Sequence, residues 1–381
     1  MQDLRLHQLA ELLLTHSIGI RTGEQFEINA GIAAKPLIKA IMKRAQELGA
    51  VPHVRLEDDE LQRLFYGFID PDHPEAAKAV IEKQVEWEKA RWAHLAAHVD
   101  IGVDENDAEL SAADPRALAL YRAAMRPVRD IRIDERRWVY LHWPTMADAQ
   151  KANMCYDDLY EFFLRSALVD YARMREGMQP LIDLMRRTNE VRILGPGTDI
   201  AFSIRGMPVV PCFGERNIPD GEVYTAPLRE SANGVIQYNT ALHMLGRQYH
   251  DPQLVFQNGR IVEASCANDT AGLNRLLDTD EGARYLGEFA LGVNNEITQP
   301  MGNTLYDEKI GGSFHLTPGC AYASAFNGNK SALHMDIVCL QSPPYGGEIW
   351  FDGVCIRRDG RFTLPELFAL NPEGPAGGAH A

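Results

Sequence analysis

The tripeptide His334-Met335-Asp336 is the strongest local sign of chemistry in this sequence. It lies inside the apolar segment 331–339, which predicts a buried strand. Residues i and i+2 of a strand point to the same face, so His334 and Asp336 would project together. Burying such a pair is costly unless both groups find partners, and a divalent cation satisfies both. A hydrogen bond between the two side chains would satisfy them as well, and the tripeptide alone does not decide.

A second segment, 304–315, carries Glu308 and His315 on either side of a glycine pair. Adjacent glycines mark a sharp turn or a close approach of two backbones. Gly311 and Gly312 would therefore let Glu308 and His315 return to one site. Taken alone, the segment fits a surface loop equally well.

Two further glutamates stand in settings that call for a specific partner. Glu288 is the charged residue of the otherwise small and apolar stretch 287–292, and exposed glutamates usually have polar neighbours. Glu222 follows the turn-forming residues 219–221 and opens a short β-prone run. Each signal is weak by itself.

Together, the four segments supply three glutamates, one aspartate and two histidines within about 115 residues. Carboxylate and imidazole ligands suit Zn²⁺, Co²⁺ or Mn²⁺, and a bridging carboxylate can hold two ions about 3.5–4 Å apart. The sequence has no H-E-x-x-H, G-x-S-x-G or P-loop motif to supply other chemistry. We therefore expect a two-metal hydrolytic site in the C-terminal half, with these candidate ligands: Glu222, Glu288, Glu308, His315, His334 and Asp336.

In these segments the sequence resembles the aminopeptidase T/aminopeptidase S family of metallo-aminopeptidases. The resemblance rests on four motifs in order: P-D-G-E-V-Y-T-A-P at 219–227, G-E-F-A-L-G at 287–292, T-L-Y-D-E-K-I-G-G-S-F-H at 304–315 and H-M-D at 334–336. It implies two divalent metal ions (Zn²⁺, Co²⁺ or Mn²⁺) bound by the six residues above, peptide substrates and a homodimer. The spacing from Glu308 to His315 is longer than in some members.

The resemblance also implies a mechanism. Two metal ions would polarise the scissile carbonyl group and activate a water molecule. Glu222 or Glu308 would act as the general base, and the choice between them stays open. Tyr322 matches a tyrosine near the metals and would donate a hydrogen bond to the tetrahedral oxyanion. The expected reaction is hydrolysis of the N-terminal residue from a peptide.

Two other functions fit parts of the pattern. His315, His334 and Asp336 alone would form the facial triad of a mononuclear Fe(II) ring-cleaving dioxygenase, a class whose pyridine-ring members are similar in fold to the aminopeptidase family. Such a triad does not need Glu222 or Glu288, whereas a two-metal site does. The second alternative is a binding protein without activity, against which the intact ligand set argues.

Strand and helix patterns alternate in the N-terminal half, which predicts a three-layer α/β domain with a mostly parallel sheet. Pro36 near the start of one helix and Gly49 after its end agree with this pattern. The expected strands are 25–29, 51–56, 98–103 and 138–143, and the expected helices are 33–48, 74–92 and a final long helix at 157–187.

The C-terminal half is rich in strands and tight turns. Asn258-Gly259, Asp352-Gly353 and Asp359-Gly360 each predict a hairpin, and Gly195-Pro196-Gly197 predicts a further turn. An α+β domain with an antiparallel, partly closed sheet follows. We expect the N-terminal α/β domain at 1–190, the C-terminal metal-binding catalytic domain at 191–370 and a flexible tail at 371–381.

The composition excludes several classes of function. The net charge of −15 argues against nucleic acid as a partner and disfavours anionic membrane surfaces. No apolar run approaches the ~20 residues that cross a bilayer, and the N-terminus lacks the apolar core of a signal peptide, so a cytoplasmic location is the default expectation. The six cysteines form no C-x-x-C pair, and we expect them to be buried small hydrophobes.

Overall fold

The computed structural model describes residues 3–244 and 246–374, which divide into two compact units. The first unit contains the described residues up to Leu168 together with Gly214–Ile218. The second contains Val169–Phe213 and the described residues from Pro219 onward. A domain boundary at residue 190 stays a prediction.

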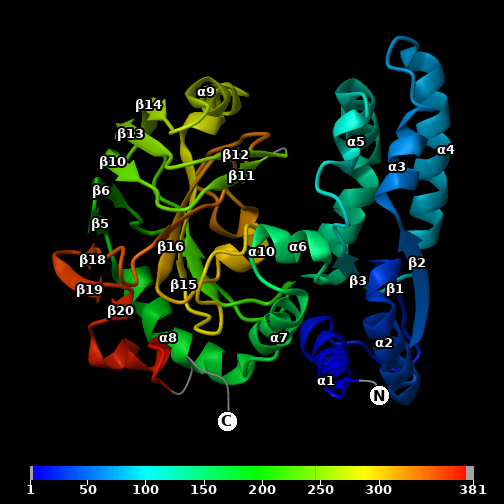
Figure 1. Ribbon diagram of the computed structural model, residues 1–381, viewed down its shortest axis with the longest axis horizontal. Coiled ribbons are helices and arrows are strands. Elements are labelled where there is room, and N and C mark those ends of the chain that lie inside the picture. Colours follow the sequence, from blue (N-terminus) through cyan, green and yellow to red (C-terminus); the bar gives the residue numbers. More distant parts are fainter. Residues whose placement is uncertain (1–2, 245, 375–381) are drawn as a thin grey trace. The chain divides into compact units, whose positions relative to one another are not determined.

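The first unit is built on a five-stranded sheet in the order β2-β1-β3-β4-β8, and every pair in it is parallel (Figure 1). The parallel sheet and the four strands expected from the sequence are therefore confirmed. The strands are β1 (Gln25–Gly31), β2 (Val51–Glu57), β3 (Ala97–Gly102), β4 (Arg137–His142) and β8 (Asn217–Ile218).

Seven α-helices accompany this sheet among the described residues. The predicted C-cap Gly49 adopts φ 70°, a left-handed conformation that glycine reaches without a steric penalty. The helices are α1 (Arg5–Glu11), α2 (Lys35–Leu48), α3 (Asp59–Tyr66), α4 (Pro74–Trp92), α5 (Pro115–Asp130), α6 (Met146–Lys151) and α7 (Tyr156–Ala167). Short 3-10 or π-helical turns are η1 (Leu12–Ser17), η2 (Ile32–Ala34), η3 (Glu109–Ala112) and η4 (Ile131–Glu135).

The expected long helix at 157–187 is wrong, because the chain forms two helices there. α7 ends at Ala167, and α8 (Tyr171–Arg187) begins after Asp170. The Asp170 side chain accepts a hydrogen bond from the backbone N–H of Arg173, 3.0 Å away, and so caps the second helix. The apolar spacing continues through the break, so periodicity alone does not reveal it.

The second unit contains two antiparallel sheets, as the turn signals predict. The eight-stranded sheet has the order β14-β13-β10-β6-β5-β18-β19-β20, and the five-stranded sheet has the order β17-β16-β15-β9-β7 (Figure 1). The strands of the larger sheet are β5 (Glu190–Gly195), β6 (Thr198–Ser203), β10 (Asn233–Gln237), β13 (Gln253–Gln257), β14 (Arg260–Ser265), β18 (Glu348–Phe351), β19 (Val354–Arg358) and β20 (Arg361–Phe362).

The smaller elements complete this unit. The strands of the five-stranded sheet are β7 (Val210–Cys212), β9 (Glu222–Thr225), β15 (Leu286–Gly292), β16 (Ser313–Pro318) and β17 (Ile337–Leu340), and a separate ribbon consists of β11 (Leu242–Met244) and β12 (Arg247–Tyr249). The remaining helices are α8, α9 (Thr270–Leu277), α10 (Thr304–Asp307), η5 (Glu281–Arg284), η6 (Ala323–Ala325) and η7 (Pro365–Leu370).

All three predicted hairpins are present. Asn258, Asp352 and Asp359 adopt φ of 49°, 47° and 50°, and each is followed by a glycine that also has positive φ. This is the type I′ geometry that Asn-Gly and Asp-Gly sequences favour, because it matches the twist of the two strands that it joins. The turn at Gly195–Gly197 likewise connects β5 to its antiparallel partner β6.

Aromatic side chains between the two sheets form part of the core. The Phe289 ring of β15 lies 5.1 Å from the Phe202 ring of β6 and 6.5 Å from the Phe351 ring of β18, centroid to centroid. Phe289 therefore faces the eight-stranded sheet. The opposite face of β15 is left for other side chains, because successive residues of a strand alternate in direction.

A buried arginine ties three loops of the second unit together. The guanidinium group of Arg357, 1% exposed, donates hydrogen bonds to the backbone oxygens of Ser313 (2.7 Å), Gly292 (3.0 Å) and Gly360 (3.2 Å). It also lies over the ring of Phe362, 4.9 Å from the centroid. The end of β15, the start of β16 and the β19–β20 turn are thereby held at fixed positions.

The expected burial of the cysteines is wrong. Cys339 is buried, but Cys155 is exposed and the other four cysteines are half-buried. The flexible tail at 371–381 stays a prediction, although its first residue, Asn371, is buried and exchanges two hydrogen bonds with the backbone of Phe362. The rest of the predicted tail, 375–381, lies outside the described residues. In the described part of the chain, no helix is both long enough and apolar enough to cross a membrane.

Candidate metal centre

Three of the candidate ligands come from neighbouring strands of the five-stranded sheet. Glu222 begins β9, Glu288 lies on β15 and His315 lies on β16, and these strands are adjacent in the order β16-β15-β9. Since Phe289 faces the other sheet, Glu288 points to the opposite face. There the Nε2 atom of His315 lies 3.0 Å from the Oε1 atom of Glu288. The apolar setting of Glu288 in the sequence is thus the setting of a buried strand with a polar partner.

A β-bulge next to Glu288 adjusts its direction. The pairing of β15 with β16 shifts register between Leu286 and Glu288. A Cβ atom at Gly287 would lie 2.4 Å from the backbone oxygen of Cys320, so a side chain has no room there. Bulges of this kind re-aim side chains beside functional sites. The glycine that precedes Glu288 is therefore part of how the carboxylate is aimed.

Glu308 and His315 are brought together by the turn between them, as the glycine pair predicts. Glu308 directly follows α10, and Gly312 has a φ of +84° just before β16 begins. A Cβ atom at Gly311 would lie 2.8 Å from the Cα atom of Asn295, which confirms the close backbone approach. The loop can return to the sheet only because both positions lack a side chain.

The expected placement of His334 and Asp336 on a strand is wrong, because β17 begins one residue later, at Ile337. The two residues lie in the preceding extended segment, where His334 forms an isolated antiparallel bridge with Gly319. The Nδ1 atom of His334 lies 2.7 Å from the backbone oxygen of Cys320, which fixes the ring. Its Nε2 atom still lies 3.2 Å from Oδ1 of Asp336, so the pair acts together without strand geometry.

The structure brings all six predicted ligands into one cluster centred on His315. The Nε2 atom of His315 lies 3.7 Å from Oε2 of Glu222 and 4.0 Å from Oδ1 of Asp336, in addition to its contact with Glu288. His334 joins the cluster through Asp336 and through Glu288, whose Oε2 atom is 3.9 Å from its Nε2. Two triads with ligand atoms within 4.8 Å of one another share His315: Glu222–Glu288–His315 and Glu308–His315–Asp336.

Two carboxylate oxygens of the cluster are buried without a hydrogen-bond donor. They are Oε2 of Glu222 and Oε2 of Glu288, whose residues are 5% and 4% exposed. An unpaired buried carboxylate oxygen is costly, and a metal ion is one of the few groups that compensate it. The residues present therefore fit a divalent cation.

The acidic surroundings keep both imidazoles protonated in this cluster. Burial lowers the pKa of His315, but its hydrogen bond to Glu288 and the nearby carboxylates raise it to about 9. Burial likewise opposes the effect of Asp336 on His334, whose pKa is raised to about 10. Burial also raises the pKa of Glu308, to about 8. Protons thus occupy groups that must lose them to bind a metal, so metal binding would release protons.

Lys309 is buried in the same cluster, although lysine side chains usually lie at the surface. The residue is 1% exposed, and its Nζ atom lies 2.5 Å from Oε1 of Glu222 and 2.7 Å from Oε1 of Glu308. Oδ1 of Asp220 lies 3.6 Å away. The sequence analysis did not include Lys309 or Asp220 in the site. Their positions in the sequence could have indicated them, because Lys309 directly follows Glu308 and Asp220 lies two residues before Glu222.

Tyr322 lies at the border of the cluster. Its ring centroid is 4.5 Å from that of His334, and the residue is 51% exposed. Its hydroxyl group is therefore available to a ligand that approaches the cluster from solvent.

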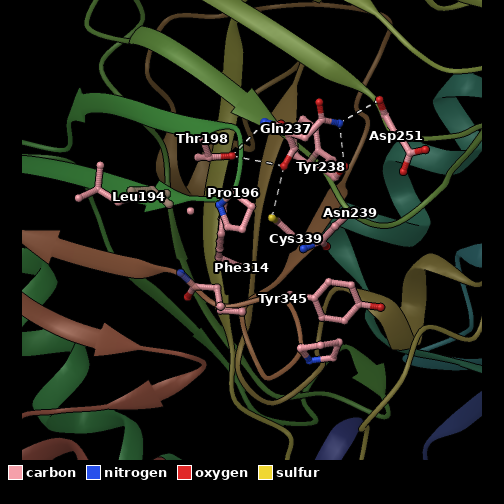
Figure 2. Close-up of a pocket in the computed structure, with 15 residues that line it drawn as sticks. Leu194, Pro196, Thr198, Gln237, Tyr238, Asn239, Asp251, Phe314, Cys339 and Tyr345 are labelled. Carbon is pink, nitrogen blue, oxygen red and sulfur yellow. Dashed lines mark hydrogen bonds between the residues drawn. The ribbon is translucent and has the colours of Figure 1, made fainter.

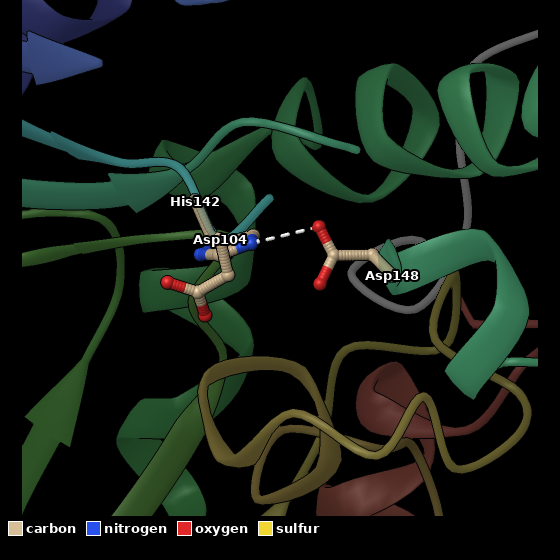
Figure 3. A group of neighbouring side chains, drawn as sticks. All are labelled: Asp104, His142 and Asp148. Carbon is tan, nitrogen blue, oxygen red and sulfur yellow. Dashed lines mark hydrogen bonds and ion pairs between the residues drawn. The ribbon is translucent and has the colours of Figure 1, made fainter. Parts of the chain in front are cut away.

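A second group of potential ligands lies in the first unit and consists of Asp104, His142 and Asp148 (Figure 3). The Nε2 atom of His142 lies 2.9 Å from Oδ2 of Asp148. Asp148 also caps α6 through Thr145 and pairs with Lys151 at 3.2 Å. Oδ2 of Asp148 is thus held by protein contacts, while its buried Oδ1 atom has the ion pair with Lys151 but no hydrogen-bond donor.

The second unit also contains a cavity of about 400 Å³ that is separate from the ligand cluster (Figure 2). Phe314 and Cys339 line it, and they alternate along their strands with His315 and Val338, so the cavity lies on the side of the sheet that faces the larger sheet. None of the six candidate ligands lines this cavity.

Comparisons with known proteins agree with this geometry. A family model described as thermophilic metalloprotease (M29) matches residues 2–343. Aminopeptidase 2 of Geobacillus stearothermophilus is 27% identical over 367 residues, which cover 86% of each chain. Aminopeptidase T of Thermus thermophilus is 34% identical over 176 residues, 40% of this chain and 43% of the relative. The solved structure of wild-type AmpT from Thermus thermophilus superposes on this chain with a TM-score of 0.80 at 23% sequence identity. The superposition covers 95% of this chain and 99% of AmpT, so the two proteins share a fold.

Proposed function

Because this chain belongs to the thermophilic metalloprotease (M29) family, a family of metallopeptidases, we propose that it is an aminopeptidase that removes the N-terminal residue from peptides. The family membership confirms the resemblance found in the sequence. Relatives named aminopeptidase 2, AmpS and aminopeptidase T support the finer assignment of activity.

One observation carries the proposal of two metal ions: two triads of buried or half-buried potential ligands share His315. Glu222, Glu288 and His315 would hold one ion. Glu308 and Asp336 of the other triad, together with His334 beside Asp336, would hold the second. The donors are oxygen and nitrogen atoms without a thiolate, which suits Zn²⁺, Co²⁺ or Mn²⁺. Such ions, when bound, act as Lewis acids on the scissile carbonyl and lower the pKa of water.

The chain's own residues supply the remaining steps. Glu308 accepts the proton of the attacking water, because its side chain is 13% exposed against 6% for Glu222 and therefore lies nearer to solvent. A base whose pKa lies near neutral pH is suited to this transfer. Tyr322, beside His334, donates a hydrogen bond to the oxygen that becomes negative in the tetrahedral intermediate. A carboxylate at the border of the cluster would bind the α-ammonium group of the substrate, which would restrict cleavage to the first residue.

The mononuclear dioxygenase is not favoured. A facial triad of His315, His334 and Asp336 would leave Glu222 and Glu288 without a role, although both lie buried in the same cluster. A binding protein without activity is not favoured either, because it would have no need for the unpaired carboxylate oxygens of Glu222 and Glu288.

The test is a screen with aminoacyl-p-nitroanilides on the purified full chain. Activity that depends on Zn²⁺, Co²⁺ or Mn²⁺, is lost with a chelator and is absent on N-acetylated substrates would agree with the proposal. Metal analysis of the same sample should give two ions per chain. One iron per chain with no release of p-nitroaniline would contradict it. A homodimer, also part of the proposal, is checked by light scattering after gel filtration; the cytoplasmic location stays a prediction.

A further inference from the structure

Lys309 is a fixed positive charge inside the candidate metal centre. Its ammonium group lies between Glu222 and Glu308, and Asp220 is a third carboxylate within 4 Å. Lys309, Glu222 and Asp220 are buried and the side chain of Glu308 is 13% exposed, so water screens these contacts only weakly. The lysine is thus a component of the site.

The backbone determines where this side chain points. The N–H group of Lys309 donates to the backbone oxygen of Tyr306 at 3.1 Å, and its own backbone oxygen accepts from the N–H group of Asn294 at 3.1 Å. The next residue, Ile310, pairs with Asn294 in a parallel bridge. Lys309 is therefore anchored on both sides of its Cα atom, and its side chain has one direction in which to enter the cluster.

The contacts divide the two oxygens of Glu222 between different tasks. Oε1 accepts a hydrogen bond from Lys309 at 2.5 Å, while Oε2 has no donor and lies 3.7 Å from Nε2 of His315. A carboxylate held in this way can offer one oxygen to a cation while the other stays on the ammonium group. The same ammonium group holds Glu308 at 2.7 Å and so keeps both glutamates in place.

The charges of the site agree with this arrangement. Five carboxylates lie in the site: Asp220, Glu222 and Glu288 are buried, and Glu308 and Asp336 are half-buried. With one ammonium group, and with both histidines neutral as ligands, four negative charges are left. Two divalent cations neutralise that number, whereas without Lys309 the loaded site would carry a buried negative charge.

We infer that Lys309 is a positioning residue that makes Glu222 a one-oxygen ligand and holds Glu222 and Glu308 in place before any metal binds. This inference rests on the proposed function. It adds to it a role for a residue that does not touch the metal or the substrate.

The first test compares K309M with K330M, which replaces an exposed lysine of the same unit. Each full-length variant is heated with a chelator and with saturating Zn²⁺. Losing one partner of a buried ion pair should lower the melting temperature of metal-free K309M by about 6–20 °C. The loss should be several degrees smaller with Zn²⁺, because the cations then balance most of the carboxylates. K330M should match the wild type under both conditions. Equal losses of K309M with and without Zn²⁺ would mean a purely structural lysine and would overturn the inference.

The second test needs no variant and therefore stands even where K309M fails to fold. The wild-type protein is crystallised with Zn²⁺, and the coordination of Glu222 is read directly. The expected result is one Zn–O contact from Oε2, with Oε1 still on the ammonium group of Lys309. Binding through both oxygens, or a lysine turned out of the cluster, would overturn the inference while the proposed function stands. A wild-type protein that takes up no divalent metal would contradict both.

Discussion

Replacing Arg357 should destabilise the second unit more than any surface substitution near it. The guanidinium group is 1% exposed and donates to three backbone oxygens, and the structure gives it no carboxylate partner among the described residues. Burial lowers its pKa to about 9, so the group is still charged at neutral pH. In R357M the three backbone oxygens lose their donor and keep their buried surroundings.

The size of the effect follows from these contacts. A hydrogen bond to a charged group contributes roughly 1.5–3 kcal/mol, so three of them bring on the order of 4–9 kcal/mol. Burying the charge costs several kcal/mol, and methionine removes that cost. The expected net loss is roughly 2–5 kcal/mol. R357K should lose nearly as much, because a single ammonium group cannot reach three oxygens that the planar guanidinium serves from different sides.

Denaturant unfolding of the full chain, followed by circular dichroism, measures this loss. R358M is the matched control, because Arg358 is the neighbouring residue, is exposed and forms an ion pair with Glu348 at 2.8 Å; it should change stability by no more than about 0.5 kcal/mol. Equal midpoints for R357M and R358M would refute the view that Arg357 holds β15, β16 and the β19–β20 turn together.

Three further predictions concern the site and the first unit. E288Q should lower kcat/KM at least about 10³-fold and reduce the metal content below two ions per chain, while the circular dichroism spectrum stays unchanged. Full activity of this variant would show that Glu288 is not part of the site. Y322F should lower kcat by about 10- to 1,000-fold at unchanged metal content, since Tyr322 is 51% exposed and its hydroxyl group would donate to the developing oxyanion; an unchanged kcat would assign Tyr322 to packing. Burial raises the pKa of Asp100, but His98 and Arg132 outweigh that effect and the pKa lies below the ordinary value. The ionised carboxylate therefore stabilises the fold fully above about pH 4, the ordinary pKa of an aspartate, and this contribution is lost as pH falls through the lowered pKa. D100N should lower the free energy of unfolding by roughly 1–3 kcal/mol at pH 7 and by less near pH 3. A loss that grows toward acid pH would contradict the assignment.

The sequence predicts correctly those turns and helix ends whose conformation depends on the residues at that position alone. Asn258-Gly259 and the two Asp-Gly pairs predict their hairpins, because the positive φ of a type I′ turn depends on the turn residues themselves. Gly49 predicts its helix end for the same reason. The break between α7 and α8 depends on one capping side chain, Asp170, within continuous apolar spacing, and so it was not anticipated.

The metal centre was predictable by residue type and less so by geometry. Glu222, Glu288 and His315 meet because β9, β15 and β16 pair, and no short-range pattern gives the order of strands. His334 and Asp336 meet in an extended segment before β17 instead of on it. The burial of Lys309 could not be read from its neighbours in the sequence, because its partner Glu222 lies 87 residues away.

The return of the chain to the first unit at Gly214–Ile218 has a consequence for how this protein can be made. Strand β8 pairs with Tyr140 and Leu141 of β4, yet it is synthesised only after the whole segment 169–213 of the second unit. A nascent chain that ends at Leu168 exposes β4 as an unprotected edge, the kind of surface on which strands from other molecules add. Expression of the first unit as a fragment should therefore yield aggregates unless residues 214–218 are grafted onto it, because a proteolytic cut after Leu168 leaves β8 on the other fragment.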